Sequence, residues 1–346
     1  MHYDVFNGDA DGICALLQLR LEQPLVSTRI TGIKRDIALL KSVHAEPGDT
    51  VTVLDISMIK NNDALRQLLA KGVVVDYVDH HAAGEIPDHA NLTATISEAP
   101  EVCTALLVNG RLRGARVEWA ITGAFGDNLD EPAQRLAEKS GLRASDIEAL
   151  RELGICINYN GYGPSLDDLH FHPDALYESL FEAERPQAFL GSSTFRKLHQ
   201  GYQQDLAASA ALTPVVEQPA FAVYQLPNAS WARRVSGVFS NDLVRAYPER
   251  AHAVLTERDD DSFLVSVRAP FTRRTGAEAV CSQFETGGGR EAAAGINRLP
   301  AGDLDRLVNA LAAEYGGQRI HQAIEVTSGQ AINACRSLPA PTGFKL

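Results

Sequence analysis

Residues 73–81 read VVVDYVDHH, a β-branched run that ends in the triplet Asp79, His80 and His81. A short, nearly continuous apolar run of this kind is typical of a strand buried on both faces of a parallel sheet. A polar triplet has little structural purpose at the end of such a strand, whereas carboxylate and neutral imidazole together suit manganese, iron, zinc or cobalt. The stretch therefore predicts a parallel sheet with a metal site at the carboxyl end of this strand.

Other apolar segments end on carboxylates in the same way. Asp9 and Asp11 follow YDVFN, Asp55 follows VTVL, and Asp127 follows the helical segment GAFG. In open α/β sheets, ligands bind beyond the carboxyl ends of the strands, so these side chains should share one pocket. A bridging carboxylate can serve two divalent ions at once. The order of the acids therefore predicts a two-metal centre.

Two of these acids also have a purely structural interpretation. Asp11 can open a helix as its N-cap, where a carboxylate accepts a hydrogen bond from a free amide. Asp127 can be a turn residue at the end of a helix. Asp55 is different, because an unpaired buried carboxylate is costly and bridging two metals is its most economical role. The alternatives for Asp11 and Asp127 stay open at this point.

The rest of the chain predicts two domains. Short apolar runs alternate with helical segments over residues 1–185, which indicates an α/β domain whose parallel sheet is covered by helices on both faces. Residues 186–215 are Ala/Gln/Leu-rich and predict a helical connector. A smaller α/β domain, expected to lie across a cleft, follows over residues 216–326. Residues 327–346, with two prolines and several small residues, predict an irregular tail.

Composition restricts the class of partner. The 346 residues carry a net charge of −12 and contain 45% hydrophobic residues, as an ordinary globular protein does. Proteins that bind long polynucleotides usually present a basic face, so the acidic balance favours a small substrate and no long nucleic-acid partner. If the chain assembles, a homodimer is the commonest form.

The sequence also predicts a cytoplasmic protein without a membrane partner. No apolar stretch is long enough to span a bilayer, and MHYDVFNGDADG lacks the basic and apolar regions of a signal peptide. The five cysteines are scattered and never form a C-x-x-C pair, a pattern typical of reduced thiols.

Taken in order, the motifs GDADG, LDIS, DHH and GDN resemble those of the DHH phosphoesterase superfamily. Downstream, SGVFSN, SVRA and GGGREAAAGIN resemble the DHH-associated substrate-binding domain. The resemblance spans nearly the whole chain. It implies a centre of two divalent ions, with manganese expected and magnesium or cobalt as alternatives.

The resemblance also implies a role for each matching residue. One ion would be held by Asp9, Asp55 and Asn7, and the other by Asp11, Asp55, His80 and Asp127. Asp79 would orient a ligand or bind a metal directly, and His81 would lie near the scissile phosphate. In the second domain, Gly287, Gly288 and Gly289 would let backbone amides approach a phosphate or base, while Arg268 and Arg290 would hold the far end of the substrate.

Two positions depart from the family pattern. Many members carry a histidine ligand two or four residues before Asp9, where this chain has Asn7 and Val5. Losing an imidazole should weaken the affinity for one ion or change the preferred metal. Arg290 stands where the family typically has a histidine directly after the triple glycine. Its guanidinium group can bind a phosphate through two hydrogen bonds.

The resemblance implies hydrolysis of very short nucleotides, such as pGpG, pApA or nanoRNA, to mononucleotides. Alternatives are a RecJ-like exonuclease on longer single-stranded DNA and a phosphatase on a small phosphoester. A different class is a nucleotide sensor whose metal site is impaired. The segment NYNGYG at 158–163 can stack a base on a tyrosine, but a turn after a helix is the preferred interpretation.

Overall fold

The computed structural model describes residues 1–316. The chain divides into two compact units, Met1–Asp205 and Leu206–Leu346. The predicted tail at 327–346 lies outside the described residues. The predicted boundaries at 185, 215 and 326 stay predictions. Within the range expected to be a connector, helix α9 (Ser193–Ala210) runs from the first unit into the second.

The first unit is built on a five-stranded sheet in the order β2-β1-β3-β4-β5. Every neighbouring pair is parallel, which confirms the predicted parallel sheet. The strands are β1 (His2–Phe6), β2 (Thr28–Ile30), β3 (Thr50–Leu54), β4 (Val74–Asp79) and β5 (Leu92–Ile96). Most side chains of β1, β3 and β4 are buried, which explains why apolar residues predominate in these segments.

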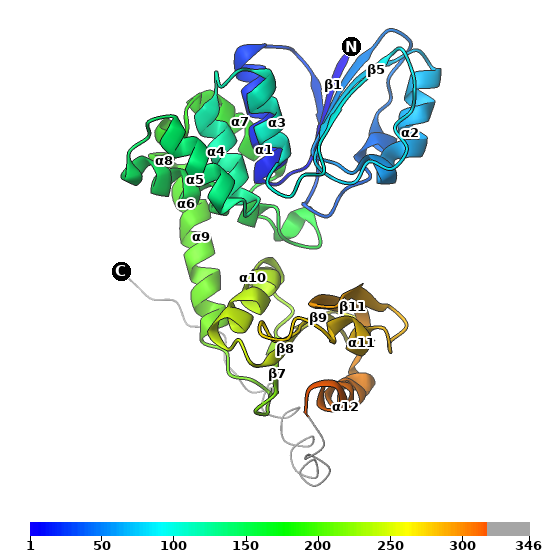
Figure 1. Ribbon diagram of the computed structural model, residues 1–346, viewed down its shortest axis with the longest axis vertical. Coiled ribbons are helices and arrows are strands. Elements are labelled where there is room, and N and C mark those ends of the chain that lie inside the picture. Colours follow the sequence, from blue (N-terminus) through cyan, green and yellow to red (C-terminus); the bar gives the residue numbers. More distant parts are fainter. Residues whose placement is uncertain (317–346) are drawn as a thin grey trace. The chain divides into compact units, whose positions relative to one another are not determined.

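Helices cover both faces of this sheet (Figure 1). On one face, α2 (Met58–Ala70) and the short 3₁₀ helix Leu39–Ser42 pack in a core that includes Val53, Leu65 and Tyr77. The other face carries α1 (Ala10–Glu22), α3 (Thr104–Arg111), α4 (Val117–Gly126) and α6 (Ala144–Asn160) around a second core. Further helices are α5 (Asp130–Lys139), α7 (Pro173–Ala183), α8 (Pro186–Leu190) and the 3₁₀ turn Leu166–Asp168.

Close contact between three of these helices depends on glycine. A Cβ added at Gly126, the last residue of α4, would lie 2.3 Å from the Cβ of Ala10 and 2.7 Å from the carbonyl oxygen of Gly154. Helix α4 therefore ends against both α1 and α6, and this packing fixes the direction in which Asp127 leaves the helix.

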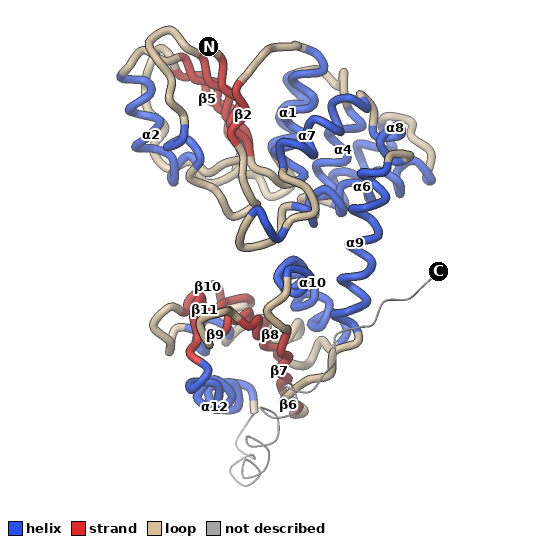
Figure 2. Tube along the Cα trace, turned by 180° about the vertical axis from the view of Figure 1, so that it is seen from behind, coloured by secondary structure: helices blue, strands red, loops and turns tan. Residues whose placement is uncertain are grey.

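The second unit contains a six-stranded mixed sheet in the order β10-β11-β9-β8-β7-β6 (Figure 2). Its strands are β6 (Val216–Glu217), β7 (Phe221–Leu226), β8 (Ala251–Glu257), β9 (Ser262–Arg268), β10 (Gly287–Arg290) and β11 (Ala293–Pro300). Its helices are α10 (Ser230–Ala246), α11 (Ala277–Cys281), α12 (Leu304–Tyr315) and the 3₁₀ turn Ala301–Asp303. Strands β8 and β9 form an antiparallel pair on either side of the Asp-rich segment 259–261.

Two further observations concern membrane spans and cysteines. Within residues 1–316, no helix is long and apolar enough to cross a membrane. Cys14, Cys103, Cys156 and Cys281 are buried with free thiols, and Cys335 lies outside the described residues.

Candidate metal centre

The carboxyl ends of the central strands deliver two of the acids. Asp79 is the last residue of β4 and is fully buried. Asp55 follows β3, and its amide still donates to the carbonyl of Val78 at 3.1 Å. The backbone of Asp55 has φ of 59°, a left-handed conformation that costs about 1–3 kcal/mol for a residue other than glycine. Strained backbone at a strand end is typical of functional sites, where it aims a side chain.

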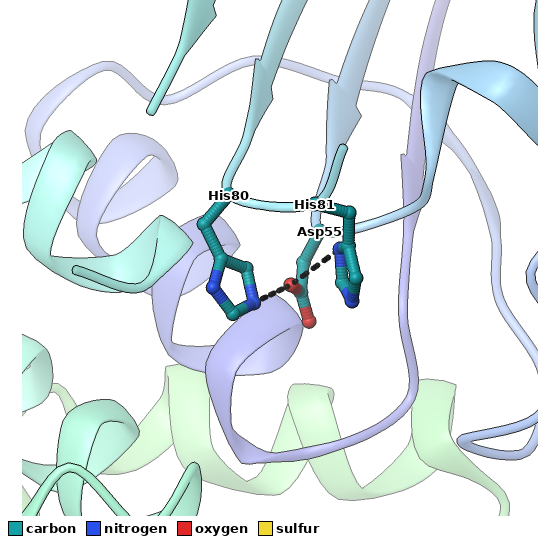
Figure 3. Close-up of side chains that lie close together, drawn as sticks. All are labelled: Asp55, His80 and His81. Carbon is teal, nitrogen blue, oxygen red and sulfur yellow. Dashed lines mark ion pairs between the residues drawn. The ribbon is translucent and has the colours of Figure 1, made fainter. Parts of the chain in front are cut away.

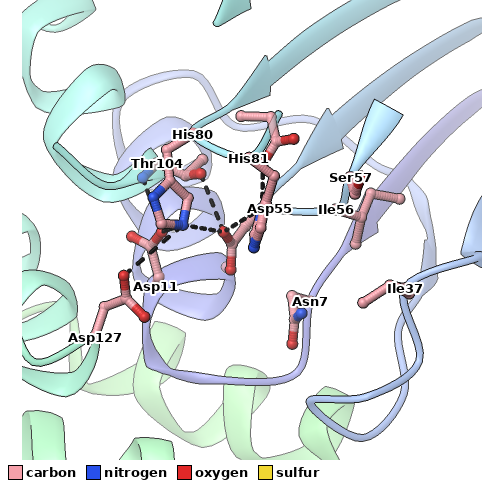
Figure 4. Close-up of polar contacts among 12 residues, drawn as sticks. Asn7, Asp11, Ile37, Asp55, Ile56, Ser57, His80, His81, Thr104 and Asp127 are labelled. Atoms are coloured by element: carbon pink, nitrogen blue, oxygen red, sulfur yellow. Dashed lines mark hydrogen bonds and ion pairs between the residues drawn. The ribbon is translucent and has the colours of Figure 1, made fainter. Parts of the chain in front are cut away.

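His80 is oriented so that one ring nitrogen faces the acids. Its Nδ1 lies 3.0 Å from the carbonyl oxygen of Val102 and can only donate there, so Nε2 is the nitrogen that carries the lone pair in the neutral ring. That Nε2 lies 3.4 Å from Oδ1 of Asp55, 3.7 Å from Oδ2 of Asp11 and 3.7 Å from Oδ2 of Asp127. Figure 4 shows the three carboxylates grouped about the imidazole ring. One ring nitrogen is therefore faced by three carboxylate oxygens.

Asp11 also ties two helices together. Its two carboxylate oxygens accept from the backbone amides of Thr104 at 2.8 Å and Ala105 at 2.7 Å, the first residues of α3. The interpretation of Asp11 as the N-cap of its own helix is wrong, because Asp9 is the residue that caps α1 and accepts from Gly12. Asp11 is therefore held rigidly by backbone amides while it faces His80.

Two groups of side chains in residues 1–316 can hold a metal ion. One is Asp11, His80 and Asp127, the other is Asp55, His80 and His81 (Figure 3), and within each group the ligand atoms lie within 4.8 Å of one another. Oxygen and imidazole donors of this kind fit manganese, cobalt or zinc. Both groups draw on His80, whose single available lone pair binds one ion. The donors therefore fit a divalent ion at Nε2 of His80.

Asp79 acts on the neighbouring histidine. Its Oδ1 lies 2.8 Å from Nδ1 of His81, and this hydrogen bond raises the pKa of His81. The other carboxylate oxygen, Oδ2, is buried without a hydrogen-bond partner among the described residues. An unpaired buried oxygen is costly, which is consistent with a cation or donor that joins the site. Nε2 of His81 carries no hydrogen bond from residues 1–316 and is available to a ligand.

Two acids of the cluster, Asp55 and Asp127, hold protons more tightly than isolated carboxyl groups do. Burial, together with the charges of Asp11 and Asp9, raises the pKa of Asp55 well above its ordinary range. The same causes raise the pKa of Asp127 to about 7. Carboxylates that raise one another's pKa in this way are stabilised when a cation joins them. The electrostatics therefore favour uptake of a positive ion.

Lys34 is a member of the site that the sequence did not suggest. Its Nζ donates to Oδ2 of Asp9 at 2.6 Å and to Oδ1 of Asn158 at 3.0 Å. Burial lowers the pKa of Lys34, but the charges of Asp9, Tyr162 and Asp127 and the hydrogen bond to Asp9 together outweigh it, and the pKa lies above its ordinary value. The available signal was its place after the strand TRI, beyond the carboxyl end of a parallel strand, where ligand-binding residues gather.

Asn7 does not face the imidazole (Figure 4). Its Oδ1 accepts from the amide of Asp9 at 3.2 Å, and its Nδ2 donates to the carbonyl of Lys34 at 3.2 Å. Asn158 comes from NYNGYG, which the sequence suggested to be a turn; it is buried in the last turns of α6. Asn7 and Asn158 thus both serve to hold Lys34.

In the second unit, the two predicted arginines lie on one face of the sheet. Arg290 pairs with Ala293, and Ala293 pairs with Arg268. Directly paired residues of antiparallel strands project to the same face, so both arginines project to one face of the sheet. Their backbones are separated by two strand spacings, or about 10 Å. Nε of Arg268 donates to Oδ1 of Asn241 in α10 at 2.9 Å, which joins the SVRA and SGVFSN motifs.

The triple glycine has a packing role as well. A Cβ added at Gly287 would lie 1.8 Å from the carbonyl oxygen of Cys281, and one at Gly289, whose φ is 150°, would lie 2.5 Å from the Cα of Ala294. Nothing lies within 4 Å of a Cβ added at Gly288. Gly287 and Gly289 are thus required for the close approach of β10 to its neighbours, whereas Gly288 faces open space.

Comparison with known proteins identifies the fold. No family model matches the sequence, and no curated protein is significantly similar to it. A solved structure of the exonuclease RecJ bound to manganese is 19% identical, with a TM-score of 0.61 over 90% of this chain and 89% of that one. The DHH domain of a protein described as a member of a ribosomal-protein family is 14% identical, with a TM-score of 0.61 over 90% and 86%. The chain has the DHH/DHHA1 fold.

A third structure with this fold is the pGpG-specific phosphodiesterase PggH from Vibrio cholerae. It is 14% identical, with a TM-score of 0.53 over 91% of this chain and all 100% of that one. The predicted DHH fold is therefore confirmed along nearly the whole chain. In this DHH fold, the Asp-His-His triplet lies at the end of β4 and contributes to a cluster that can hold a metal.

Proposed function

We propose that the protein is a metal-dependent phosphodiesterase that hydrolyses short linear oligonucleotides, such as pGpG, pApA or nanoRNA, to mononucleotides. The observation that carries the proposal is the convergence of three carboxylates on Nε2 of His80, at 3.4–3.7 Å. A bound divalent ion would supply an activated water and neutralise charge on the phosphoryl oxygens. The solved structures of a manganese-bound exonuclease and a pGpG-specific phosphodiesterase support this class of chemistry.

Each residue of the centre has a role in this proposal. Asp11, Asp55, His80 and Asp127 would hold the metal. Asp79 holds Nδ1 of His81 by a hydrogen bond of 2.8 Å, which turns Nε2 of that ring outward. Because Asp79 raises the pKa of His81, the ring can reach the scissile phosphate as a cation and donate a proton to the leaving oxygen.

The second unit would bind the far end of the substrate. Arg268 and Arg290 lie on the same face of its sheet with their backbones about 10 Å apart, and each guanidinium group can bind a phosphate. The open space at Gly288 would let a backbone amide approach the terminal nucleotide. A short substrate agrees with the net charge of −12, because a long polynucleotide needs a basic track.

A RecJ-like exonuclease on longer single-stranded DNA is the second candidate. It is favoured by the TM-score of 0.61 to RecJ, compared with 0.53 to the pGpG-specific phosphodiesterase. The two candidates share the metal centre and differ in the length of substrate. They are distinguished by product analysis and not by the geometry of the acids.

The test is product analysis of the full-length protein with manganese. The substrates are pGpG, pApA, cyclic di-GMP, cyclic di-AMP, a five-mer RNA and a thirty-mer single-stranded DNA. His80→Ala removes the central ligand, and His44→Ala, an exposed histidine of the same unit, is the matched control. We expect rapid hydrolysis of the linear dinucleotides by the parent protein and His44→Ala, and none by His80→Ala.

The other outcomes refute the proposal in part or in full. Degradation of the thirty-mer at a rate comparable to the dinucleotides would establish the exonuclease instead. No manganese-dependent turnover of any substrate, with nucleotide binding retained, would establish the non-enzymatic nucleotide sensor.

A further inference from the structure

Lys34 is held in place at its backbone as well as its side chain. It lies in the loop after β2, where its amide donates to the carbonyl of Gly161 at 2.9 Å and its own carbonyl accepts from Nδ2 of Asn7 at 3.2 Å. Only 27% of the side chain is exposed. The loop therefore presents the ammonium group at a fixed position, and Asn7 is one of the residues that fix it.

The ammonium group is surrounded by the oxygen atoms that a hard cation prefers. Nζ lies 2.6 Å from Oδ2 of Asp9, 3.0 Å from Oδ1 of Asn158 and 3.7 Å from Oδ1 of Asp127. The amide of Asn158 is oriented by a hydrogen bond of 3.0 Å from its Nδ2 to the hydroxyl of Tyr162. Two carboxylates and one amide oxygen would also suit a divalent ion at this position.

Asp127 connects Lys34 to the imidazole centre. Its Oδ1 faces Nζ of Lys34 at 3.7 Å, while its Oδ2 faces Nε2 of His80 at 3.7 Å. A carboxylate with one oxygen on each of two cations has the geometry of a bridging ligand in a two-metal site. Here one of the two cations is an ammonium group.

We propose that Lys34 replaces one of the two metal ions of the centre as a built-in cation, so that the protein takes up a single divalent ion at His80. The inference rests on the proposed metal centre but not on the proposed substrate. It explains why Asn7 stands where a histidine ligand is expected: the side chain holds the loop of the lysine. A fixed ammonium near the metal also provides a point charge for a phosphoryl oxygen.

Metal stoichiometry tests the proposal without any measurement of activity. The full-length protein is stripped with a chelator, dialysed against manganese and analysed for manganese per chain. We expect one ion in the parent protein and two in Lys34→Ala, because Asp9, Asn158 and Asp127 then share a cation position that the lysine has left. The second ion should appear as an exchange-coupled signal in the manganese EPR spectrum.

Two further variants guard against misfolding and nonspecific effects. Lys34→Arg keeps a cation at the position and should bind one ion. Lys60→Ala removes an exposed lysine from α2 and should also bind one. If Lys34→Ala does not fold, the parent protein and Lys34→Arg still decide the question, because two ions in either would overturn the inference.

The outcomes separate this inference from the proposed function. Two ions in the parent protein, or one ion in a folded Lys34→Ala, would overturn the role of Lys34 and leave the metal centre intact. No bound manganese in the parent protein would refute the metal centre itself, and the inference with it.

Discussion

The raised pKa of Asp127 makes the metal-free protein less stable as the pH rises. Burial and the charges of Asp11 and Asp9 raise this pKa from its ordinary value of 3.8 to about 7. Between these values the folded protein holds a proton that the unfolded chain has released, so the free energy of unfolding falls from about pH 4 to about pH 7. At 1.36 kcal/mol for each pH unit, the difference amounts to about 4 kcal/mol.

Asp127→Asn removes this effect with almost no change of shape. The amide does not titrate and adds no negative charge to the cluster. The metal-free variant should therefore be more stable than the parent at pH 8, by up to about 4 kcal/mol, and the difference should shrink toward pH 4. With manganese bound, the parent should be more stable than the variant at pH 8, because the carboxylate of Asp127 is a better metal ligand than the amide that replaces it.

Urea unfolding in a chelator, from pH 5 to pH 8, measures the effect. The chain has two tryptophans, Trp119 buried in the first unit and Trp231 in the second. In a Trp231→Phe background, the fluorescence of Trp119 therefore reports the first unit alone. Asp88→Asn, which removes an exposed acid of the same unit, is the control and should follow the parent at every pH. If the free energies of unfolding of Asp127→Asn and the parent change with pH in the same way over this range, the pKa of Asp127 is not raised by the neighbouring acids.

Three other perturbations test separate parts of the site. His80→Ala should lower manganese affinity at least about 100-fold, as measured by titration calorimetry, because it removes the ligand on which the acids converge. Asp79→Asn should lower the pKa of His81, shift the alkaline limb of the kcat profile to lower pH and reduce kcat about 100-fold, as measured by steady-state kinetics. Gly126→Ala should cost about 1–3 kcal/mol in urea unfolding because its methyl group meets α1 and α6, whereas Gly110→Ala in open space should not destabilise.

Each of these three has an outcome that contradicts it. Unchanged manganese affinity in His80→Ala would mean that the metal lies elsewhere. An unmoved alkaline limb in Asp79→Asn would remove the proton-donor role of His81. Equal stability of Gly126→Ala and Gly110→Ala would mean that α4 does not pack as closely as the structure shows.

Periodicity and strand-end chemistry predicted the first unit well. The buried strands are mainly apolar because both of their faces are covered, so VVVDYVDHH identifies the parallel sheet and the place of its polar triplet. The convergence of Asp11 and Asp55 on His80 follows from the rule that the carboxyl ends of parallel strands share one edge, whereas Asp127 is brought there by the end of helix α4. A local sequence pattern is sufficient to predict the position of a residue where the topology allows only one position for it.

Roles that depend on contacts between residues far apart in the chain could not be predicted from the sequence. Lys34 lies in a loop without periodicity, 25 residues from Asp9, and only the fold brings the two together. A helix cap was one interpretation of Asp11, but its carboxylate accepts hydrogen bonds from the amides of a helix that begins 93 residues later. The common face of Arg268 and Arg290 depends on the register of three strands.

The most direct test of the metal centre is anomalous diffraction from crystals of the protein grown with manganese. The structure predicts a strong peak about 2 Å from Nε2 of His80, with Asp11, Asp55 and Asp127 as its oxygen ligands and Nζ of Lys34 still on Asp9. Ordered crystals without manganese at His80, or with the ion bound at another group of side chains, would contradict it.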